Sequence, residues 1–204
     1  MGLDRPARGS ATAASFAVAL PLFGWVGTAA AADIEAGRQK AQVCAACHGP
    51  AGNSANPVVP SLASQPAQFI VTELFQFREG NRKDPQMTPL AANLSNADLN
   101  DLAAYFSAQK AAPPAHKTDP ANAAAAPALA RQFNCVQCHG PALLGQQHIP
   151  RLAGQQLEYV RTQLHAFKAQ TRADIDGTMT SAVQGLTDKD IEVLVDYLAG
   201  LAAP

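Results

Sequence analysis

The sequence predicts an all-α protein built from two similar domains, with few or no strands. Alanine is abundant in the 204 residues, and the alternation of Val, Ile and Thr that marks strands is almost absent. Such a composition favours helix over sheet. The chain also matches itself in three consecutive blocks, which predicts a duplicated domain. The paired blocks begin at Cys44 and Cys135, at Pro60 and Pro150, and at Met87 and Met179, at offsets of 91, 90 and 92 residues.

The repeats divide the chain into four predicted parts. A unit of about 90 residues is too long for a solenoid repeat but large enough for a small domain. The segment between the units holds prolines, polar residues and small residues without a periodic apolar face, and it therefore predicts a linker. We expect a signal peptide at residues 1–32, a first domain at 33–110, a linker at 111–126 and a second domain at 127–204.

The N-terminus is typical of an export signal. Arg5 and Arg8 precede an apolar stretch, and three alanines at residues 30–32 fit a cleavage site before Asp33. A retained membrane anchor is the alternative, because residues 11–32 are just long enough to span a bilayer. Cleavage would remove two of the 15 basic and one of the 16 acidic residues and leave a net charge of −2. No basic stripe or cluster indicates nucleic-acid binding.

Apolar residues recur at helical spacing in matched places of the two units. The stripes are Ile70, Leu74 and Phe77 with Val160, Leu164 and Phe167, and Leu99, Leu102, Ala103 and Phe106 with Ile191, Leu194, Val195 and Leu198. A capping residue with an acidic residue three positions later precedes the last helix of each unit, at Ser95 and Asp98 and at Thr187 and Asp190. We also expect a helix before each cysteine pair, at residues 34–43 and 127–133.

The four cysteines lie in two Cys-x-x-Cys-His segments, at Cys44, Cys47 and His48 and at Cys135, Cys138 and His139. A disulfide across so short a loop adds little stability, and a thioredoxin-like redox pair expects a βαβ context. Zinc would need a further ligand that is not obvious. Covalent attachment of one haem c to each segment is the interpretation we favour, with zinc or a redox pair as alternatives. Two cysteines three apart on a helical turn can reach two vinyl groups on one porphyrin edge, and the next histidine can offer Nε2 to the iron.

A sixth iron ligand must come from a separate segment of each unit. Met87 lies 39 residues after His48, and Met179 lies 40 residues after His139. Apart from Met1 they are the only methionines, and they occupy matching places with polar, Pro and Gly neighbours. Methionine often closes the iron of an electron carrier. We therefore expect Met87 and Met179 to be axial ligands, with filling of gaps in the core as the alternative.

The three other histidines do not repeat between the units. His116 lies in the predicted linker, His165 on a helix face and His148 in the loop before Pro150. We expect them at the surface or partly buried. Ligation by His148 is the main competitor of ligation by Met179.

These segments resemble those of class I cytochrome c domains, and the tandem resembles the dihaem cytochrome c4 family. Besides the two "CxxCHG" segments, the resemblance rests on "NRKDPQM" and "TRADIDGTM" before the methionines and on "LSNADLNDLAAYF" and "LTDKDIEVLVDYL" in the last helices. It covers nearly all of the expected mature chain. It implies two packed all-α domains, each with a low-spin His/Met haem.

The resemblance also implies a function. Members of this family carry electrons in the periplasm, often in loose association with the membrane, and are not enzymes. The implied partners are redox proteins, with a donor such as a quinol-oxidising complex and an acceptor such as a terminal oxidase.

Matched residues outside the ligands gain implied roles as well. Pro60 and Pro150 stand where a proline carbonyl accepts a hydrogen bond from the proximal histidine, although each could simply join a loop to a helix. Arg82 and Arg172 precede the methionine segments, and either pair with haem propionates or are solvated.

Two positions concern the packing of the first and last helices. Tyr105 and Tyr197 match an aromatic residue of the last helix that packs on the first helix, and we expect both in the core rather than on an electron path. Gly37 stands where a close helix crossing is expected. Its counterpart is Ala128, which predicts slightly looser packing in the second domain.

Two other functions compete with a simple carrier. A dihaem redox enzyme, such as a peroxidase or a thiosulfate-oxidising protein, would need one iron with an open or labile site, whereas both units here hold a methionine. A cytochrome subunit of a larger membrane-bound dehydrogenase or oxidase would be favoured by a retained N-terminal apolar segment.

Overall fold

Helices and loops make up the described part of the chain. The computed structural model describes residues 1–2 and 31–203, and from Ala32 onward these residues form one compact unit. The only β-type pairing among them is an isolated bridge between Gln146 and Ile149, so the predicted all-α class is confirmed. Most of the predicted signal peptide lies outside the described residues. No helix within the described ranges is long and apolar enough to cross a membrane.

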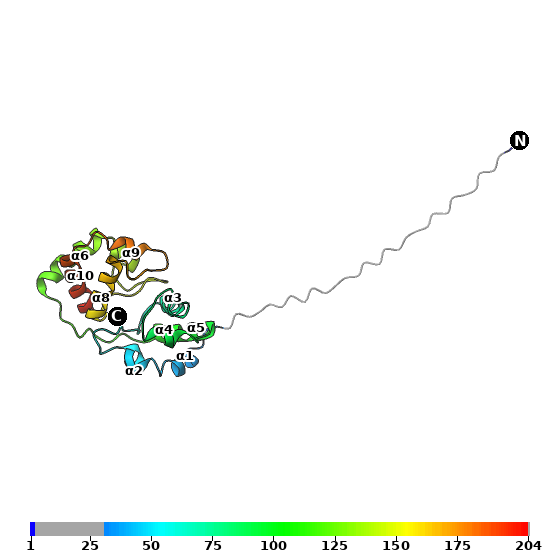
Figure 1. Cartoon of the computed structure of the whole chain (residues 1–204), viewed down its shortest axis with the longest axis horizontal. Coiled ribbons are helices and arrows are strands. Elements are labelled where there is room, and N and C mark those ends of the chain that lie inside the picture. The colour runs from blue at the N-terminus through cyan, green and yellow to red at the C-terminus, as the bar shows by residue number, and fades with distance from the viewer. Residues whose placement is uncertain (3–30, 204) are drawn as a thin grey trace. The chain divides into compact units, whose positions relative to one another are not determined.

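The helices follow the same order twice (Figure 1). In the first half, residues 33–110, they are α1 (Ile34–Lys40), α2 (Ala45–His48), the 3₁₀ turn η1 (Pro50–Gly52), α3 (Ala67–Arg78), α4 (Met87–Ala91) and α5 (Asn96–Ser107). In the second half, residues 111–203, they are α6 (Pro120–Gln132), α7 (Cys135–His139), α8 (Leu157–Lys168), α9 (Thr178–Ala182) and α10 (Asp188–Gly200). Apart from η1, each helix of the first half has its counterpart in the second, as the sequence repeat predicted.

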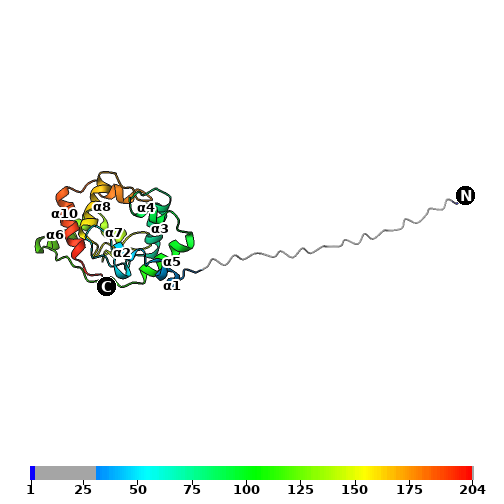
Figure 2. The ribbon, with the colours of Figure 1, turned by 60° about the horizontal axis from the view of Figure 1, so that its bottom comes forward.

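Each half has its own apolar core. In the first half α1 and α3 both pack on α5, and in the second half α6 and α8 both pack on α10. The predicted stripes supply these cores, with every member buried except the half-buried Leu74. Tyr105 and Tyr197 pack against the two cores, as expected. Figure 2 shows α1 and α5 on one side of the molecule and α6 and α10 on the other.

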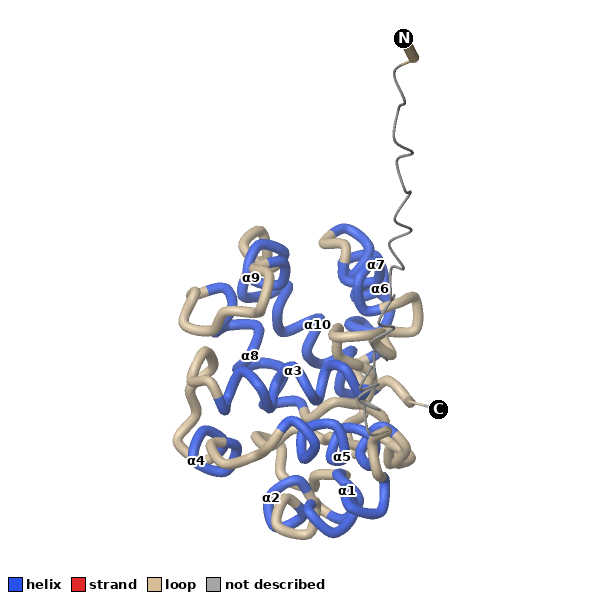
Figure 3. The backbone as a smooth tube through the Cα atoms, turned by 90° about the vertical axis from the view of Figure 1, so that its right-hand side faces the viewer, coloured by secondary structure: helices blue, strands red, loops and turns tan. Residues whose placement is uncertain are grey.

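The two halves meet mainly through the loops that precede α3 and α8. Figure 3 shows α3 and α8 in the middle of the view, with the remaining helices of the second half above them and those of the first half below. At this junction the Tyr159 N–H at the start of α8 donates to the Pro57 carbonyl of the first half at 2.9 Å. The helices that carry the candidate ligands therefore belong to two cores that meet near the starts of α3 and α8.

Both last helices begin at the predicted capping boxes. Ser95 Oγ accepts a hydrogen bond from the Asp98 N–H at 3.1 Å, and the Asp98 carboxylate accepts one from the Ser95 N–H at 2.8 Å. Thr187 and Asp190 repeat the arrangement at 2.8 and 3.1 Å. Reciprocal bonds of this kind satisfy backbone groups that a helix start leaves free, and so they fix where α5 and α10 begin.

The helix before the second cysteine pair is longer than predicted. We expected it at residues 127–133, but α6 begins at Pro120, inside the predicted linker. Asp119 caps it by accepting a bond from the Ala121 N–H at 2.7 Å, and Pro120 takes a position where no N–H is needed. The alanines that follow favour helix and continue it through Pro127, a residue type that usually interrupts a helix.

The end of the predicted linker is fastened to the second half. The Asp196 carboxylate on α10 accepts a hydrogen bond from His116 Nε2 at 2.6 Å. It also accepts bonds from the Asp119 N–H and the Asn122 side chain, both at 2.9 Å. Burial disfavours the charged form of Asp196, but the hydrogen bonds outweigh this effect and lower its pKa. This segment is therefore ordered by contacts and does not act as a free tether.

Gly37 marks the closest approach of α1 to α5. A Cβ at this position would lie 2.0 Å from the Asp101 carbonyl oxygen and 2.9 Å from Tyr105 Cβ, both on α5. Only glycine fits so near a backbone oxygen, which confirms the expected close crossing. α1 ends at Lys40, three residues before the expected end.

Replacing Gly37 with alanine should destabilise the protein. In an open helix the change would add about 1 kcal/mol of stability, since alanine is the better helix former. Against the Asp101 backbone, overpacking should instead cost about 1–3 kcal/mol. Chemical denaturation followed by circular dichroism gives the sign. Ala126 and Ala130 are the buried residues of α6, whereas Ala128 is exposed, so the looser packing expected from Ala128 does not apply. Ala128→Gly is therefore a control for helix propensity alone and should lose about 1 kcal/mol. A stabilised Gly37→Ala protein would contradict the close crossing.

Asp101 holds the start of α1 against α5. Its carboxylate accepts a hydrogen bond from the Asp33 N–H at 2.8 Å and another from Lys40 Nζ at 3.0 Å. The bond from the Asp33 N–H, followed by that from Lys40, lowers the pKa of Asp101.

The stability that Asp101 provides should fade in acid. Its pKa is lower in the folded than in the unfolded chain, so the contribution is complete above the ordinary aspartate value of about 3.9. It is lost as the pH falls through the folded value. The thermal midpoint of Asp101→Asn should lie below that of the unaltered chain at neutral pH, and the gap should close in acid. A gap that persists unchanged in acid would contradict this account.

Candidate haem sites

The two Cys-x-x-Cys-His segments form the short helices α2 and α7. Cys44 caps α2 and Cys135 opens α7, and a histidine ends each helix. All four thiols are free. Burial raises the pKa of Cys44 and Cys135, whereas a reactive redox thiolate has a lowered pKa. Within the described ranges no three His, Cys, Asp or Glu side chains gather as a metal site.

One hydrogen bond fixes each attachment histidine. His48 Nδ1 lies 2.8 Å from the Pro60 carbonyl oxygen, and His139 Nδ1 lies 2.8 Å from the Pro150 carbonyl oxygen. A carbonyl can only accept, so Nδ1 carries the proton and Nε2 keeps its lone pair for a metal. The role expected for the two prolines is therefore confirmed. Their carbonyls orient the rings, beyond any part they have in joining loop to helix.

The two histidines are neutral at neutral pH. Each is only 6% exposed. Burial lowers the pKa of His48 and His139, and the hydrogen bond to the proline carbonyl offsets this only in part. Neutral imidazole is the form that binds a metal ion, so both rings have the right charge, tautomer and orientation.

Met87 and Met179 stand at matching short helices. Met87 is the first residue of α4 and Met179 is the second residue of α9, where we had expected loop. Asp84 accepts a bond from the Met87 N–H at 2.8 Å, and Asp174 accepts one from the Met179 N–H at 2.7 Å. These carboxylates satisfy first-turn N–H groups, which explains why helix begins here. Both methionines are half-buried, and Met179 borders the second core.

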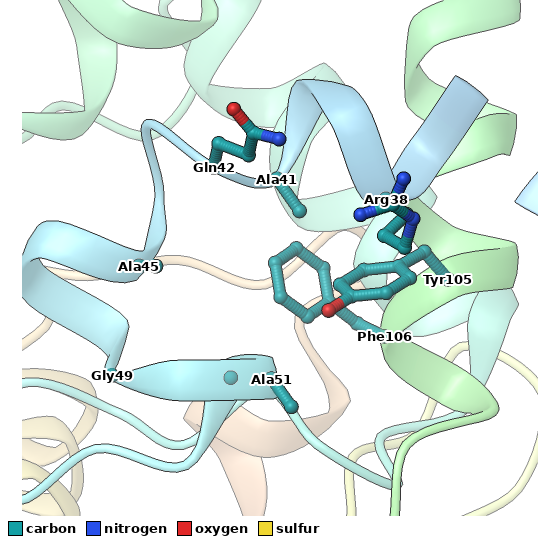
Figure 4. A pocket seen from close by; sticks show the side chains of 9 residues that line it. Arg38, Ala41, Gln42, Ala45, Gly49, Ala51, Tyr105 and Phe106 are labelled. Carbon is teal, nitrogen blue, oxygen red and sulfur yellow. The ribbon is translucent and has the colours of Figure 1, made fainter. Parts of the chain in front are cut away.

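A surface pocket lies beside the first attachment segment without including the candidate ligands. It measures about 200 Å³ and lies among α1, α2 and α5, with the rings of Tyr105 and Phe106 in its wall (Figure 4). Neither His48 nor Met87 lines it. Its volume is also below the roughly 300–1,000 Å³ of most ligand pockets. This pocket is therefore not the haem site.

Each of the three other histidines faces a carboxylate. The pairs are His116 with Asp196 at 2.6 Å, His148 with Asp176 at 3.9 Å and His165 with Asp188 at 4.0 Å. Their side chains are 30–42% exposed, in line with the expected surface or partly buried roles. Asp176 lies three residues before Met179, so His148 stays near the second methionine segment.

The sequence is similar to those of known proteins. The family model for cytochrome c matches the chain twice, at residues 34–110 and 123–202. A cytochrome c4 from Thiocapsa roseopersicina is 40% identical over 182 residues, which covers 83% of this chain and 93% of the relative. This chain belongs to the dihaem cytochrome c4 family.

Two further matches extend the comparison. The crystal structure of reduced recombinant cytochrome c4 from Pseudomonas stutzeri is similar with a TM-score of 0.78 and 35% identity, over 84% of this chain and 100% of that chain. A thiosulfate dehydrogenase electron acceptor from Thiomonas intermedia (strain K12) is 34% identical over 84% of each chain.

This cytochrome consists of two tandem cytochrome c domains and carries two covalently bound haem c groups. The residues present fit these groups. Each half offers a pair of free cysteines on one helical turn, a neutral histidine with Nε2 available, and a half-buried methionine whose backbone a carboxylate anchors. The fold and the cofactors expected from the sequence are therefore confirmed.

Arg82 and Arg172 are not solvated, so that alternative is wrong. Their side chains are 14% and 12% exposed. Each guanidinium stacks on a phenylalanine of its own half, 4.6 Å from the centre of the Phe77 ring and 4.5 Å from that of Phe167. Arg172 Nε is buried and has no partner among the described residues. This N–H is a donor that a haem propionate could use. Pairing with a propionate was the other role expected for these arginines.

The same arginines join the two halves through Glu73 on α3 and Gln163 on α8. Arg82 forms an ion pair with Glu73 in its own half and a hydrogen bond of 3.1 Å to Gln163 in the other. Arg172 bonds Gln163 at 2.5 Å, and its Nη2 lies 3.3 Å from Glu73 Oε2 across the junction. Glu73 and Gln163 are counterparts, 90 residues apart. This arginine cluster therefore holds two cations and one anion between the domains.

Three further junction residues were missed by sequence reasoning. Gln65 and Gln155 are 2% and 5% exposed and occupy matching positions in the two repeats. Arg151 donates to the Ala63 carbonyl of the first half at 2.9 Å, and burial lowers its pKa to about 10. A glutamine that recurs five residues after each histidine-holding proline was the available signal.

Replacing Glu73 with glutamine should destabilise the junction. Two largely buried guanidinium groups would lose their carboxylate, a loss that costs up to about 3 kcal/mol at this degree of exposure. The matched change Gln163→Glu supplies a second carboxylate and should stabilise the fold. Thermal unfolding measures both shifts. Two shifts of the same sign would contradict the cluster.

Proposed function

We propose that this cytochrome is an electron carrier in which both irons are closed by protein ligands. His48 and Met87 would bind the first iron and His139 and Met179 the second, with thioether bonds at Cys44, Cys47, Cys135 and Cys138. The observation that supports this most is the repetition: each half places a carbonyl-oriented neutral histidine and one anchored methionine in matching positions. A carrier needs both irons closed, whereas an enzyme needs one of them open to substrate.

Bound haem supplies one-electron chemistry between Fe(II) and Fe(III). The residues of the chain hold the group and tune it. The proline carbonyls keep each imidazole in place and raise the basicity of Nε2. Thioether ligands favour the reduced iron. In each half a buried carbonyl holds the histidine ring and a carboxylate holds the backbone of the methionine. Electron transfer therefore requires no exchange of ligands.

The proposed location is the periplasm, and the proposed partners are other redox proteins. The signal-like residues 1–32 support export, with cleavage before Asp33, the residue that caps α1. We propose domains at residues 33–110 and 127–204, a donor such as a quinol-oxidising complex and an acceptor such as a terminal oxidase. The two haems together could store two electrons or pass them from one partner to the other.

A second candidate is supported by one relative. The Thiomonas intermedia protein is named as a thiosulfate dehydrogenase electron acceptor. On this reading the cytochrome receives electrons from a sulfur-oxidising dehydrogenase and remains a carrier. Stopped-flow reduction by a thiosulfate dehydrogenase and by a quinol-oxidising complex distinguishes the two donors, since the physiological donor should reduce the haems much faster.

The ligand set predicts the absorption of the oxidised protein. Iron(III) bound to methionine gives a weak band in the far red, and two closed sites should give two haems' worth of it. Met87→Ala and Met179→Ala should each remove about half of the band, since each leaves one iron without its thioether. His148→Ala is the matched control and should leave the band intact. If Met179→Ala kept the full intensity of the band, His148 would be favoured as the ligand and the proposal would be contradicted.

A further inference from the structure

The peptide group that holds the first histidine is itself held from the opposite half. The Pro60 carbonyl, which accepts the bond from His48, belongs to the same peptide group as the Ser61 N–H. That N–H donates to Gln155 Oε1 at 2.7 Å. The imidazole, the peptide group and the glutamine amide therefore form one continuous hydrogen-bond chain, and the glutamine comes from the second half.

The second histidine has the mirror arrangement. The Pro150 carbonyl accepts from His139 at 2.8 Å, and the Arg151 N–H of the same peptide group donates to Gln65 Oε1 at 2.9 Å. Gln65 belongs to the first half. The two hydrogen-bond chains thus cross the junction in opposite directions, and each starts at a histidine and ends on a glutamine of the other domain.

Each glutamine also closes a second bond on the same residue. Gln155 Nε2 donates to the Ser61 carbonyl at 2.9 Å, and Gln65 Nε2 donates to the Arg151 carbonyl at 3.0 Å. These four residues are 2–6% exposed. Hydrogen bonds in such a dry environment are strong and polarise one another when they lie in a chain. An acceptor on the peptide N–H makes the carbonyl of that peptide a better acceptor for the imidazole.

We infer that Gln65 and Gln155 are positioning residues, each of which tunes the haem of the opposite domain. Gln155 strengthens the bond at His48 and thus acts on the first haem, and Gln65 does the same for the second haem through His139. A stronger Nδ1–H bond makes the imidazole more basic, which stabilises Fe(III) and lowers the potential. The inference rests on the proposed function, because it requires both histidines to be iron ligands.

A bond that only joined the two domains would not need to end on the peptide group that holds a histidine. Gln156, the next residue, also crosses the junction, and its Nε2 donates to the Ser54 carbonyl at 2.6 Å. That bond fastens the domains without touching the peptide group of Pro60. Gln156 Nε2 also lies 3.4 Å from Ser61 Oγ, and the Gln156 N–H donates to Gln155 Oε1 at 2.9 Å, a backbone bond that Gln156→Leu keeps. Its side chain makes no bond to the Pro60–Ser61 peptide group, so Gln156 is the control for Gln155.

The test compares Gln155→Leu, Gln65→Leu and Gln156→Leu in the full holoprotein. The two axial methionine methyl signals of the reduced protein, assigned with Met87→Ala and Met179→Ala, identify the haems in an NMR-monitored redox titration. Gln155→Leu should raise the ratio of reduced to oxidised first haem about threefold at a given potential, with a smaller change at the second haem. Gln65→Leu should do the reverse, and Gln156→Leu should change neither.

The inference requires each glutamine variant to shift the potential of the haem in the opposite domain. Shifts at the haem of the same domain, equal shifts at both haems, or no shift at all would overturn the inference. If a leucine variant fails to fold, Gln155→Glu is the second variant: it loses the donor to the Ser61 carbonyl but puts a charged acceptor on the Ser61 N–H. It should lower, not raise, the potential of the first haem more than that of the second. If the Met variants leave both methyl signals in place, the proposed ligand set has failed. Unshifted potentials with the expected methyl signals instead mean that only the inference has failed.

Discussion

The hydrogen bond from a histidine to a proline carbonyl is the interaction on which both sites depend. At 2.8 Å in each half, it sets the tautomer of a buried imidazole and leaves the Nε2 lone pair free for a metal ion. The cysteine pair lies within the same turn of helix, and the methionine stands on a separate segment that a carboxylate anchors. If the proline carbonyl moved, the ring would turn, and a ligand set requires geometry held to a fraction of an ångström.

The junction explains why the duplicated units behave as one protein. A unit of about 90 residues has little core of its own, and covalent haem adds to it. The two units are joined by polar groups, most of which have hydrogen-bond partners. Two glutamines each bond a backbone N–H and a backbone carbonyl of the other half, and two arginines share Glu73 and Gln163. Polar contacts of this kind specify an orientation more than they add stability. The result is a fixed arrangement in which each domain contacts the peptide that orients the other domain's histidine.

The sequence was sufficient for features encoded within one unit. Helical stripes and capping boxes follow from local spacing, the role of Pro60 follows from the resemblance to the family, and the structure shows all three. It was insufficient for α6, where alanines outweigh the interruption expected at Pro127. It was also insufficient at the junction, because no periodicity within a unit shows how two units dock. Arg82 and Gln155 therefore could not be placed, although the recurrence of each in the second repeat marks them as more than surface residues.

We propose that protein ligands close both irons, so that this cytochrome is a carrier and not an enzyme. Addition of carbon monoxide to the fully reduced holoprotein tests it most directly, because the gas binds ferrous haem only where a coordination position is open or readily vacated. With both irons closed, we expect the visible spectrum of both haems to stay unchanged. A shift of the spectrum that corresponds to one haem would contradict it and would show that one of the two sites can accept a substrate.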